Sequence, residues 1–172
     1  VLMLHHLVPD EVEPGSLRAN LDHYLPRTAH GSSLSPAICA SLLARAGRPD
    51  EALPLFRMAG RMDLDDLTDT TAGGLHLATM GGLWQAVAFG FAGLREDQGA
   101  LRMDPILPSA WNEIELCCVF RGCSIRLRLR ADLVEIFTDA PLAVALGTDR
   151  HAVDAPGERF ARRGDKWREV RR

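Results

Sequence analysis

The sequence lacks the cysteine spacing of an ordinary zinc site. Its four cysteines are Cys39, Cys117, Cys118 and Cys123, and none of them forms a C-x-x-C pair. Neighbouring cysteines such as Cys117 and Cys118 seldom bridge each other. We therefore expect reduced, buried thiols and no bound metal, as in a cytoplasmic protein.

Long hydrophobic runs and an excess of basic charge are also missing. The apolar start, residues 1–8, is interrupted by His5 and His6 and is far shorter than the roughly 20 residues that cross a bilayer. The chain has 20 Lys and Arg against 23 Asp and Glu, a net charge of -3, which disfavours nucleic acid as the main partner. This start shows no basic segment typical of a signal peptide, so we expect no secretory signal. We expect no membrane or nucleic-acid partner and a cytoplasmic location.

What the sequence does have is the composition of a globular chain, 47% hydrophobic and 25% charged over 172 residues. The first part, residues 1–97, predicts helices. A helix is predicted to begin at Ser35 and Pro36, because Pro is favoured in the first helical turn. The same helix is predicted to end at Gly47, because Gly is favoured just after the last helical turn. Pro54 is expected to strain or shorten the next helix. A long apolar helix is predicted over residues 75–94.

The second part predicts short strands that alternate in polarity, over residues 114–120, 125–129, 133–137 and 142–146. Short connections between such strands require antiparallel pairing. The alternating stripe Arg126, Arg128 and Arg130 indicates either a solvated sheet face or a grip for a polyanion. We therefore expect a helical portion at 1–97, a β domain at 98–160 and a basic tail at 161–172.

The fold class predicted from these patterns is α+β, with helices followed by a small antiparallel sheet or sandwich. Two other classes of function stay open at this point. Residues 42–59 have the rhythm of one tetratricopeptide repeat, which would indicate a helical-repeat interaction module, although no second copy follows. Trp111 is compatible with a noncatalytic carbohydrate-binding β domain.

Two polar segments precede predicted helices and could bind an anion. The segment 30–36 holds three hydroxyls at a helix start, where unpaired N–H groups and the helix dipole favour negative charge. Plain helix capping by Ser35 is the alternative that stays open, although it accounts for only one of the three serines. The segment 70–76 places His76 after two glycines, where the imidazole could bind an anion, transfer a proton or serve only in packing.

The carboxylates Asp63, Asp65, Asp66 and Asp69 lie just before the second of these segments. Such a cluster could bind a cation or act in proton transfer. The alternative, which we favour here, is that these carboxylates cap and solvate a loop. No carboxylate in the chain stands in a pattern typical of a general acid, and no P-loop, dinucleotide fingerprint or Ser-His-Asp signature is present.

Five segments in order resemble the C-terminal part of glycoside hydrolase family 65. They are VLML, NLDHYLPRTAHGSSLSP, FRMAGRMDLDDL, TTAGGLHLATMGGLWQAVAFGFAGLR and LRMDPILPSAW. The resemblance covers residues 1–146. The family includes inverting phosphorylases of trehalose, maltose, kojibiose and nigerose, and hydrolases such as acid trehalases. It implies the final helices of an (α/α)6 catalytic barrel, followed by a small C-terminal β-sheet domain.

The resemblance also implies a site. In the family a glutamic acid protonates the glycosidic oxygen while inorganic phosphate, the co-substrate, attacks the anomeric carbon. Matched by motif, Ser32 and Ser33 would hold phosphate oxygens, His76 would bind the phosphate, and Gly73 and Gly74 would allow close backbone approach. No further cofactor is implied. The general-acid glutamate of the family is expected upstream of Val1, so no catalytic residue is assigned here.

The chain by itself is therefore expected to be inactive, although its parent would convert a disaccharide and phosphate to glucose 1-phosphate. Exposed apolar helix faces at Leu2, Leu4 and Leu7 are expected to drive aggregation, a homodimer or coverage by a partner segment.

We predict that the 172-residue chain releases no glucose 1-phosphate from trehalose, maltose or kojibiose in the presence of phosphate, because it lacks a general acid. An enzyme-coupled assay for glucose 1-phosphate measures this directly. Robust release would show that a carboxylate within residues 1–172 performs the protonation.

Overall fold

The computed structural model describes residues 1–170, which fall into two compact units that meet between Phe91 and Ala92. The first unit is helical and the second is built of strands, which confirms the α+β expectation. The boundary lies earlier than the predicted position after residue 97, because Arg95–Asp97 already forms a strand of the second unit. In residues 1–170 no helix has the length and apolar character that crossing a membrane requires.

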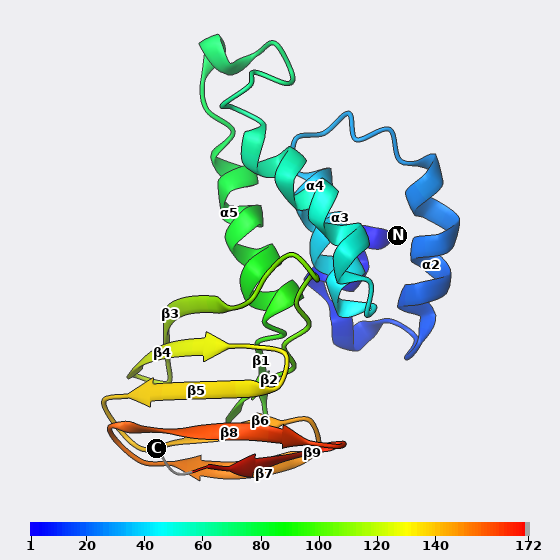
Figure 1. Ribbon diagram of the computed structural model, residues 1–172. Helices are drawn as coiled ribbons and strands as arrows, with labels where there is room; N and C mark the ends of the chain where they lie inside the picture. The colour runs from blue at the N-terminus through cyan, green and yellow to red at the C-terminus, as the bar shows by residue number, and fades with distance from the viewer. Residues whose placement is uncertain (171–172) are drawn as a thin grey trace. The chain divides into compact units, whose positions relative to one another are not determined.

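The helical unit contains five α-helices (Figure 1). The last of them continues directly into a π-helix, Ala86–Phe91. Single turns of 3-10 helix lie at Pro9–Glu11, Leu25–Arg27 and Thr71–Gly73. The α-helices are α1 (Leu2–Leu7), α2 (Ser16–Tyr24), α3 (Ser35–Arg45), α4 (Pro49–Arg61) and α5 (Leu77–Gln85).

Helix α3 forms the centre of this unit, since every residue from Pro36 to Ala44 is buried. It ends as predicted at Gly47, whose φ of 78° is left-handed. The amide of Arg48 donates to the carbonyl of Leu43 at 2.9 Å and that of Gly47 donates to Ala44 at 2.9 Å. This pair of bonds is the Schellman arrangement that satisfies the last carbonyls of a helix.

Helix α4 continues through Pro54 to Arg61, so the predicted shortening is wrong. Pro54 is exposed, whereas Ala52, Leu53 and Ala59 are buried. Pro removes one backbone donor from the helix. Burial of the apolar face, which packs against α3, offsets that loss.

Helix α5 and its π-helical continuation approach α3 closely through two glycines. A Cβ on Gly82 would lie 3.1 Å from the Cβ of Ala37, and a Cβ on Gly90 would lie 2.8 Å from the Cα of Ser41. No side chain fits at position 90 unless the backbone of α3 moves. The two glycines therefore set how closely these helices pack.

The described part of the second unit, residues 92–170, forms nine strands in two sheets, ordered β1-β2-β6-β7 and β3-β4-β5-β8-β9. In β4 the inward residues Ile125, Leu127 and Leu129 are buried while the arginines between them face outward. The strands are β1 (Arg95–Asp97), β2 (Ala100–Met103), β3 (Ile114–Phe120), β4 (Cys123–Leu129), β5 (Leu133–Thr138), β6 (Leu142–Leu146), β7 (Asp149–Val153), β8 (Gly157–Arg163) and β9 (Lys166–Glu169).

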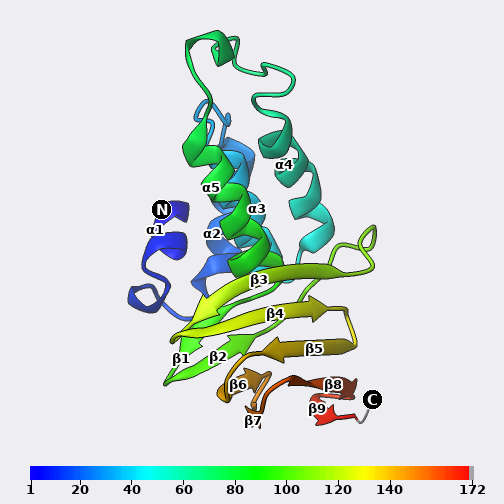
Figure 2. The same cartoon turned by 90° about the vertical axis from the view of Figure 1, so that its left-hand side faces the viewer.

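The two sheets pack on each other as the expected sandwich, and the ring of His151 on β7 lies 4.6 Å from that of Phe160 on β8. One pair departs from the antiparallel prediction, because β2 and β6 are parallel. The chain passes through β3, β4 and β5 between them, so no short connection constrains their direction (Figure 2).

Arg128 of β4 and Arg130, which follows that strand, form ion pairs along the sheet face. Arg128 lies 3.0 Å from Glu115, and Arg130 lies 2.7 Å from Glu113. These are cross-strand pairs on an exposed surface, where each contributes little to stability. Of the two interpretations of the arginine stripe, a solvated sheet face therefore explains these contacts without an added polyanion.

The residues expected to form a basic tail instead complete the second sheet. Strand β8 extends to Arg163, and β9 pairs with it through Lys166–Glu169. Trp167, 4% exposed, anchors this hairpin in the core, with the guanidinium of Arg162 placed 5.7 Å from its ring centre. Burial of the Trp167 side chain stabilises this hairpin, so the segment is ordered although its basic charge predicted a solvated or frayed end. Arg171 and Arg172, also assigned to the tail, lie outside the described residues.

Large apolar side chains are exposed on the helical unit. Leu4 is 53% exposed and Leu7 66%, as expected, although Leu2 is half-buried. A second exposed group lies on α5 and the loop before it, and comprises Leu64, Leu67, Leu75, Leu77, Met80 and Trp84. An exposed apolar group of this kind is typical of a surface that contacts other protein.

We predict that Gly90→Ala destabilises the helical unit by about 1–3 kcal/mol, because the added methyl overlaps the α3 backbone. Gly81→Ala is the matched control: a Cβ there meets no atom within 4 Å, and Ala in an exposed helix stabilises by about 0.5–1 kcal/mol. Urea unfolding followed by helical circular dichroism measures both variants. Equal stability of the two would show that α3 and α5 do not depend on this close approach.

Candidate functional site

The segment before α3 forms a polar turn whose hydrogen bonds differ from simple helix capping. The hydroxyl of Ser35 donates to the carbonyl of Ser32 at 3.1 Å and also lies 2.9 Å from Nδ1 of His30. The predicted capping of the helix by Ser35 is therefore wrong, since α3 has no side-chain cap. In the described part of the chain, the hydroxyls of Ser32 and Ser33 have no hydrogen-bond partner, so both are available to a ligand.

The loop between α4 and α5 is organised by three carboxylates with different partners. Asp63 binds His76, with 2.5 Å between Oδ1 and Nδ1 and 2.9 Å between Oδ2 and the backbone N–H of His76. Asp66 accepts the amides of Thr70 and Thr71 at 3.0 and 2.9 Å. Asp65 pairs with Arg61 at the end of α4. The prediction that these carboxylates cap the loop is therefore confirmed for Asp66. Asp63 instead forms hydrogen bonds with the ring and the backbone N–H of His76.

These contacts hold the carboxylates in their charged form. The hydrogen bond from His76 lowers the pKa of Asp63, and its backbone N–H adds to this effect. The amide and hydroxyl of Thr71 likewise lower the pKa of Asp66. Because donors favour the ionised form, the loop keeps both negative charges well into acid conditions. In the segment before α3, burial lowers the pKa of His30.

Gly73 and Gly74 lie at the outer part of the same loop, and both are exposed. A Cβ built at either position meets no atom within 4 Å, and Gly74 has a φ of 138° that side chains rarely adopt. The backbone here is therefore open to a ligand, and Gly74 supplies a conformation that other residues would strain.

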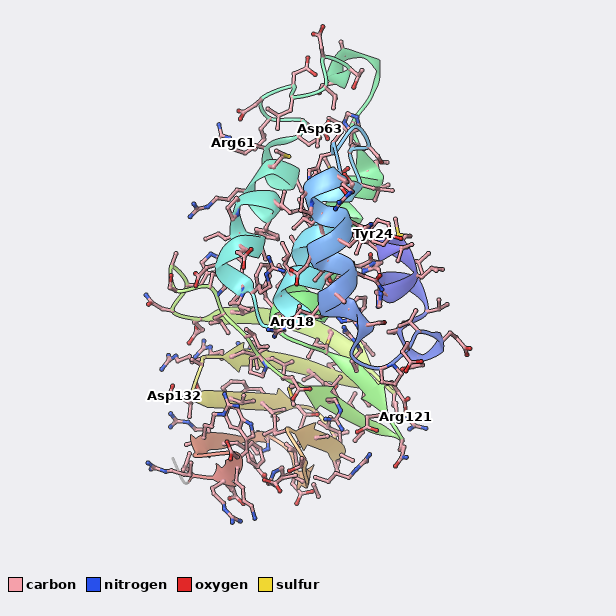
Figure 3. All side chains as sticks on the ribbon, turned by 90° about the vertical axis from the view of Figure 1, so that its right-hand side faces the viewer. Arg18, Tyr24, Arg61, Asp63, Arg121 and Asp132 are labelled. Carbon is pink, nitrogen blue, oxygen red and sulfur yellow. The ribbon has the colours of Figure 1, made fainter. Side chains whose placement is uncertain are left out.

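The two polar segments lie at the same end of the helical unit. Figures 1 and 2 both show the segment before α3 close to the start of α5, with the loop from α4 extending beyond them. Figure 3 shows Asp63 at this end of the unit and Arg18 towards the other. Within the described residues no hydrogen bond joins Ser32 or Ser33 to His76. The fold thus brings the candidate residues to one end without a direct polar contact between the segments.

Residues 1–170 contain no cluster of three or more His, Cys, Asp or Glu side chains that could hold a metal ion. Their cysteines are all free. Cys39 is buried, and burial raises the pKa of its thiol. Cys117 is exposed, which corrects the expectation of buried thiols throughout. Alternation along β3 turns Cys117 outward and Cys118 inward.

Two family models match the chain. The glycosyl hydrolase family 65 central catalytic domain matches residues 1–85, and the glycosyl hydrolase family 65 C-terminal domain matches residues 94–153. These ranges follow the two structural units closely. The match of residues 1–85 to a catalytic domain overturns the alternative of a helical-repeat module.

Several curated relatives of this chain are disaccharide phosphorylases by name. The α,α-trehalose phosphorylase of Thermoanaerobacter brockii is 40% identical over 78% of this chain and 17% of its own length. The kojibiose phosphorylase of Escherichia coli is 34% identical over 85% of this chain and 19% of its own length. The maltose phosphorylase of Bacillus subtilis is 39% identical over 71% of this chain and 16% of its own length.

A solved structure shares the fold. It is described as a candidate kojibiose phosphorylase from the human microbiome, has a TM-score of 0.84 and is 28% identical. The match covers 94% of this chain and 22% of that one. The chain thus spans less than a quarter of the proteins it resembles.

We predict that the loop of residues 63–76 loses its order only in strong acid. A carboxylate with a lowered folded pKa stabilises the fold above its unfolded pKa, and this contribution disappears as the pH falls through the folded value. For Asp63 and Asp66 that window lies at and below the ordinary value of 3.8. Hydrogen exchange at the amides of Thr70, Thr71 and His76, corrected for intrinsic rates, should show protection at pH 5 and loss below this window. Loss of protection already at pH 5 would contradict these carboxylate contacts.

Proposed function

Because the chain belongs to glycosyl hydrolase family 65, we propose that it is part of an inverting disaccharide phosphorylase and supplies the phosphate-binding side of its active site. The helical unit would contribute the last helices of an (α/α)6 catalytic barrel. The strand unit corresponds to the C-terminal domain of the family. The reaction would convert an α-glucoside disaccharide and inorganic phosphate to glucose 1-phosphate and a free sugar.

The observation that carries this proposal is the placement of two polar segments at one end of the helical unit. One offers the free hydroxyls of Ser32 and Ser33 next to the start of an eleven-residue helix, α3. The other offers His76, held by Asp63, beside the open backbone of Gly73 and Gly74. Hydroxyls, amides at helix starts and an imidazole are the donors that bind a phosphate dianion.

The chemistry gives this anion site a direct role. A glutamic acid outside residues 1–172 would donate its proton to the glycosidic oxygen as the bond to the anomeric carbon breaks. A phosphate oxygen would attack that carbon from the opposite face, so the configuration inverts. Phosphate replaces the water that an inverting hydrolase activates. Holding the anion beside the sugar would account for most of the rate enhancement, because a reaction between two dissolved molecules becomes a reaction within one bound complex.

We predict that a chimera restores phosphorolysis. In the α,α-trehalose phosphorylase of Thermoanaerobacter brockii, this chain would replace the segment to which it aligns. Release of glucose 1-phosphate should depend on phosphate. Replacing both Ser32 and Ser33 by Ala should raise the KM for phosphate by about hundredfold or more, since each of the two lost hydrogen bonds to a charged group contributes about 1.5–3 kcal/mol.

The matched control for this double variant is Ser16→Ala in the chimera. Ser16 donates to the carbonyl of Glu13 at the start of α2, away from the candidate site, so the KM for phosphate should not change. Release of free glucose at a rate independent of phosphate would indicate a hydrolase such as a trehalase. An unchanged KM in the Ser32 and Ser33 variant would remove these residues from the phosphate site.

A further inference from the structure

The contact between Asp63 and His76 is the most completely formed polar interaction at the candidate site. The carboxylate uses both oxygens, Oδ1 for the ring nitrogen Nδ1 at 2.5 Å and Oδ2 for the backbone N–H at 2.9 Å. The side chain of Asp63 is only 10% exposed and that of His76 is 21% exposed. The ring and the backbone of one residue are therefore held by a single carboxylate that is nearly withdrawn from solvent.

This geometry fixes the chemical state of the ring. A carboxylate only accepts hydrogen bonds, so Nδ1 must carry the proton. The other nitrogen, Nε2, has one partner within the described residues, the hydroxyl of Thr70 at 3.4 Å, which is a long contact. Nε2 is thus the ring nitrogen available to a ligand. When the ring is protonated on both nitrogens, Nδ1 donates to Asp63 and Nε2 can donate to an anion.

Neighbouring carboxylates do not share this arrangement. Asp66 accepts two backbone amides with Oδ1 and shapes the loop, while Asp65 pairs with Arg61. Neither makes a hydrogen bond to the imidazole. The loop therefore separates two functions, since Asp66 maintains the turn and Asp63 orients the histidine.

We propose that Asp63 is a positioning residue for phosphate binding: it holds a proton of His76 on Nδ1 and fixes the direction of the ring, so that Nε2 faces the anion and donates to it when both ring nitrogens are protonated. This inference rests on the proposed function, because it assigns His76 to phosphate. Asp63 is charged at neutral pH, since its hydrogen bond from His76 keeps its pKa below the ordinary value. Asp63 acts through the ring and does not contact the phosphate itself.

The first test needs no substitution. In the 172-residue chain labelled with nitrogen-15, the two ring nitrogens of His76 are observed by long-range correlation NMR at a pH where the ring is neutral. Nδ1 should appear as the protonated nitrogen and Nε2 as the unprotonated one. The opposite tautomer would overturn the proposal whether or not any variant folds.

The second test compares variants in the same chain, with inorganic phosphate as the ligand. Asp63→Asn has only one acceptor oxygen and cannot hold both the ring and the backbone N–H. It should weaken phosphate binding by about tenfold and shift the ring nitrogens towards a mixture of tautomers. Asp63→Glu, which keeps the carboxylate, should recover part of the affinity.

The matched control is Asp66→Asn in the same loop. Asn is tolerated at its left-handed φ of 47°, and its side-chain oxygen can still accept an amide. Phosphate affinity should change less than about twofold, with ring nitrogen shifts unchanged, because the hydrogen bonds to His76 remain. An equal loss in Asp66→Asn would mean that loop order alone matters and would overturn the positioning role.

The outcomes separate this inference from the proposed function. If the unmodified chain binds phosphate and Asp63→Asn binds it equally, with unchanged ring nitrogens, only the positioning role fails. If the unmodified chain binds no phosphate, the phosphate site itself fails, and the role of Asp63 in phosphate binding fails with it.

Discussion

The close approach of α5 to α3 is the constraint on which the candidate site depends. Gly82 and Gly90 have no side chains that would separate the helices, so Ala37 packs against the backbone of α5 and Ser41 against that of its π-helical continuation. The N-terminal ends of both helices then lie at one end of the unit. A polar segment precedes each of these helices, residues 30–36 before α3 and residues 70–76 before α5. The proposed phosphate site, which draws on two distant stretches of sequence, therefore depends on a packing contact between glycines and a neighbouring helix.

The loop between α4 and α5 shows how similar side chains acquire different roles. Asp63 and Asp66 are three residues apart. Asp63 accepts hydrogen bonds from His76 and from the hydroxyl of Thr71, whereas Asp66 accepts them from the amides of Thr70 and Thr71. Asp63 lies next to the end of α4, where the loop folds back and places His76 against it. Asp66 lies further out and binds only its own turn. A carboxylate in an exposed loop is ordinarily well solvated, and the near-complete burial of Asp63 follows from its contact with the histidine.

Much of the fold could be predicted from local patterns. Gly47 ended α3 because a left-handed residue satisfies the last carbonyls, and alternation placed Ile125, Leu127 and Leu129 in the core. The predictions were wrong where contacts between residues far apart in the sequence determine the local structure. Pro54 stayed within α4 because its neighbours are buried, and the supposed basic tail became β9 because Trp167 fits the core. The parallel pair of β2 and β6 could not be predicted from connection lengths, since three strands intervene.

The sequence by itself determined the family, the order of helices and strands, and the residue types that could bind an anion, because these depend on segments that are contiguous in the chain. Only the tertiary structure decided that Asp63 serves His76 and that Ser35 binds within its own turn. Thirteen positions separate Asp63 from His76, and hydrogen bonds across such a distance depend on how the loop closes. Composition cannot distinguish a carboxylate that solvates a loop from one that orients a ring, because the difference lies in the direction and burial of a single side chain.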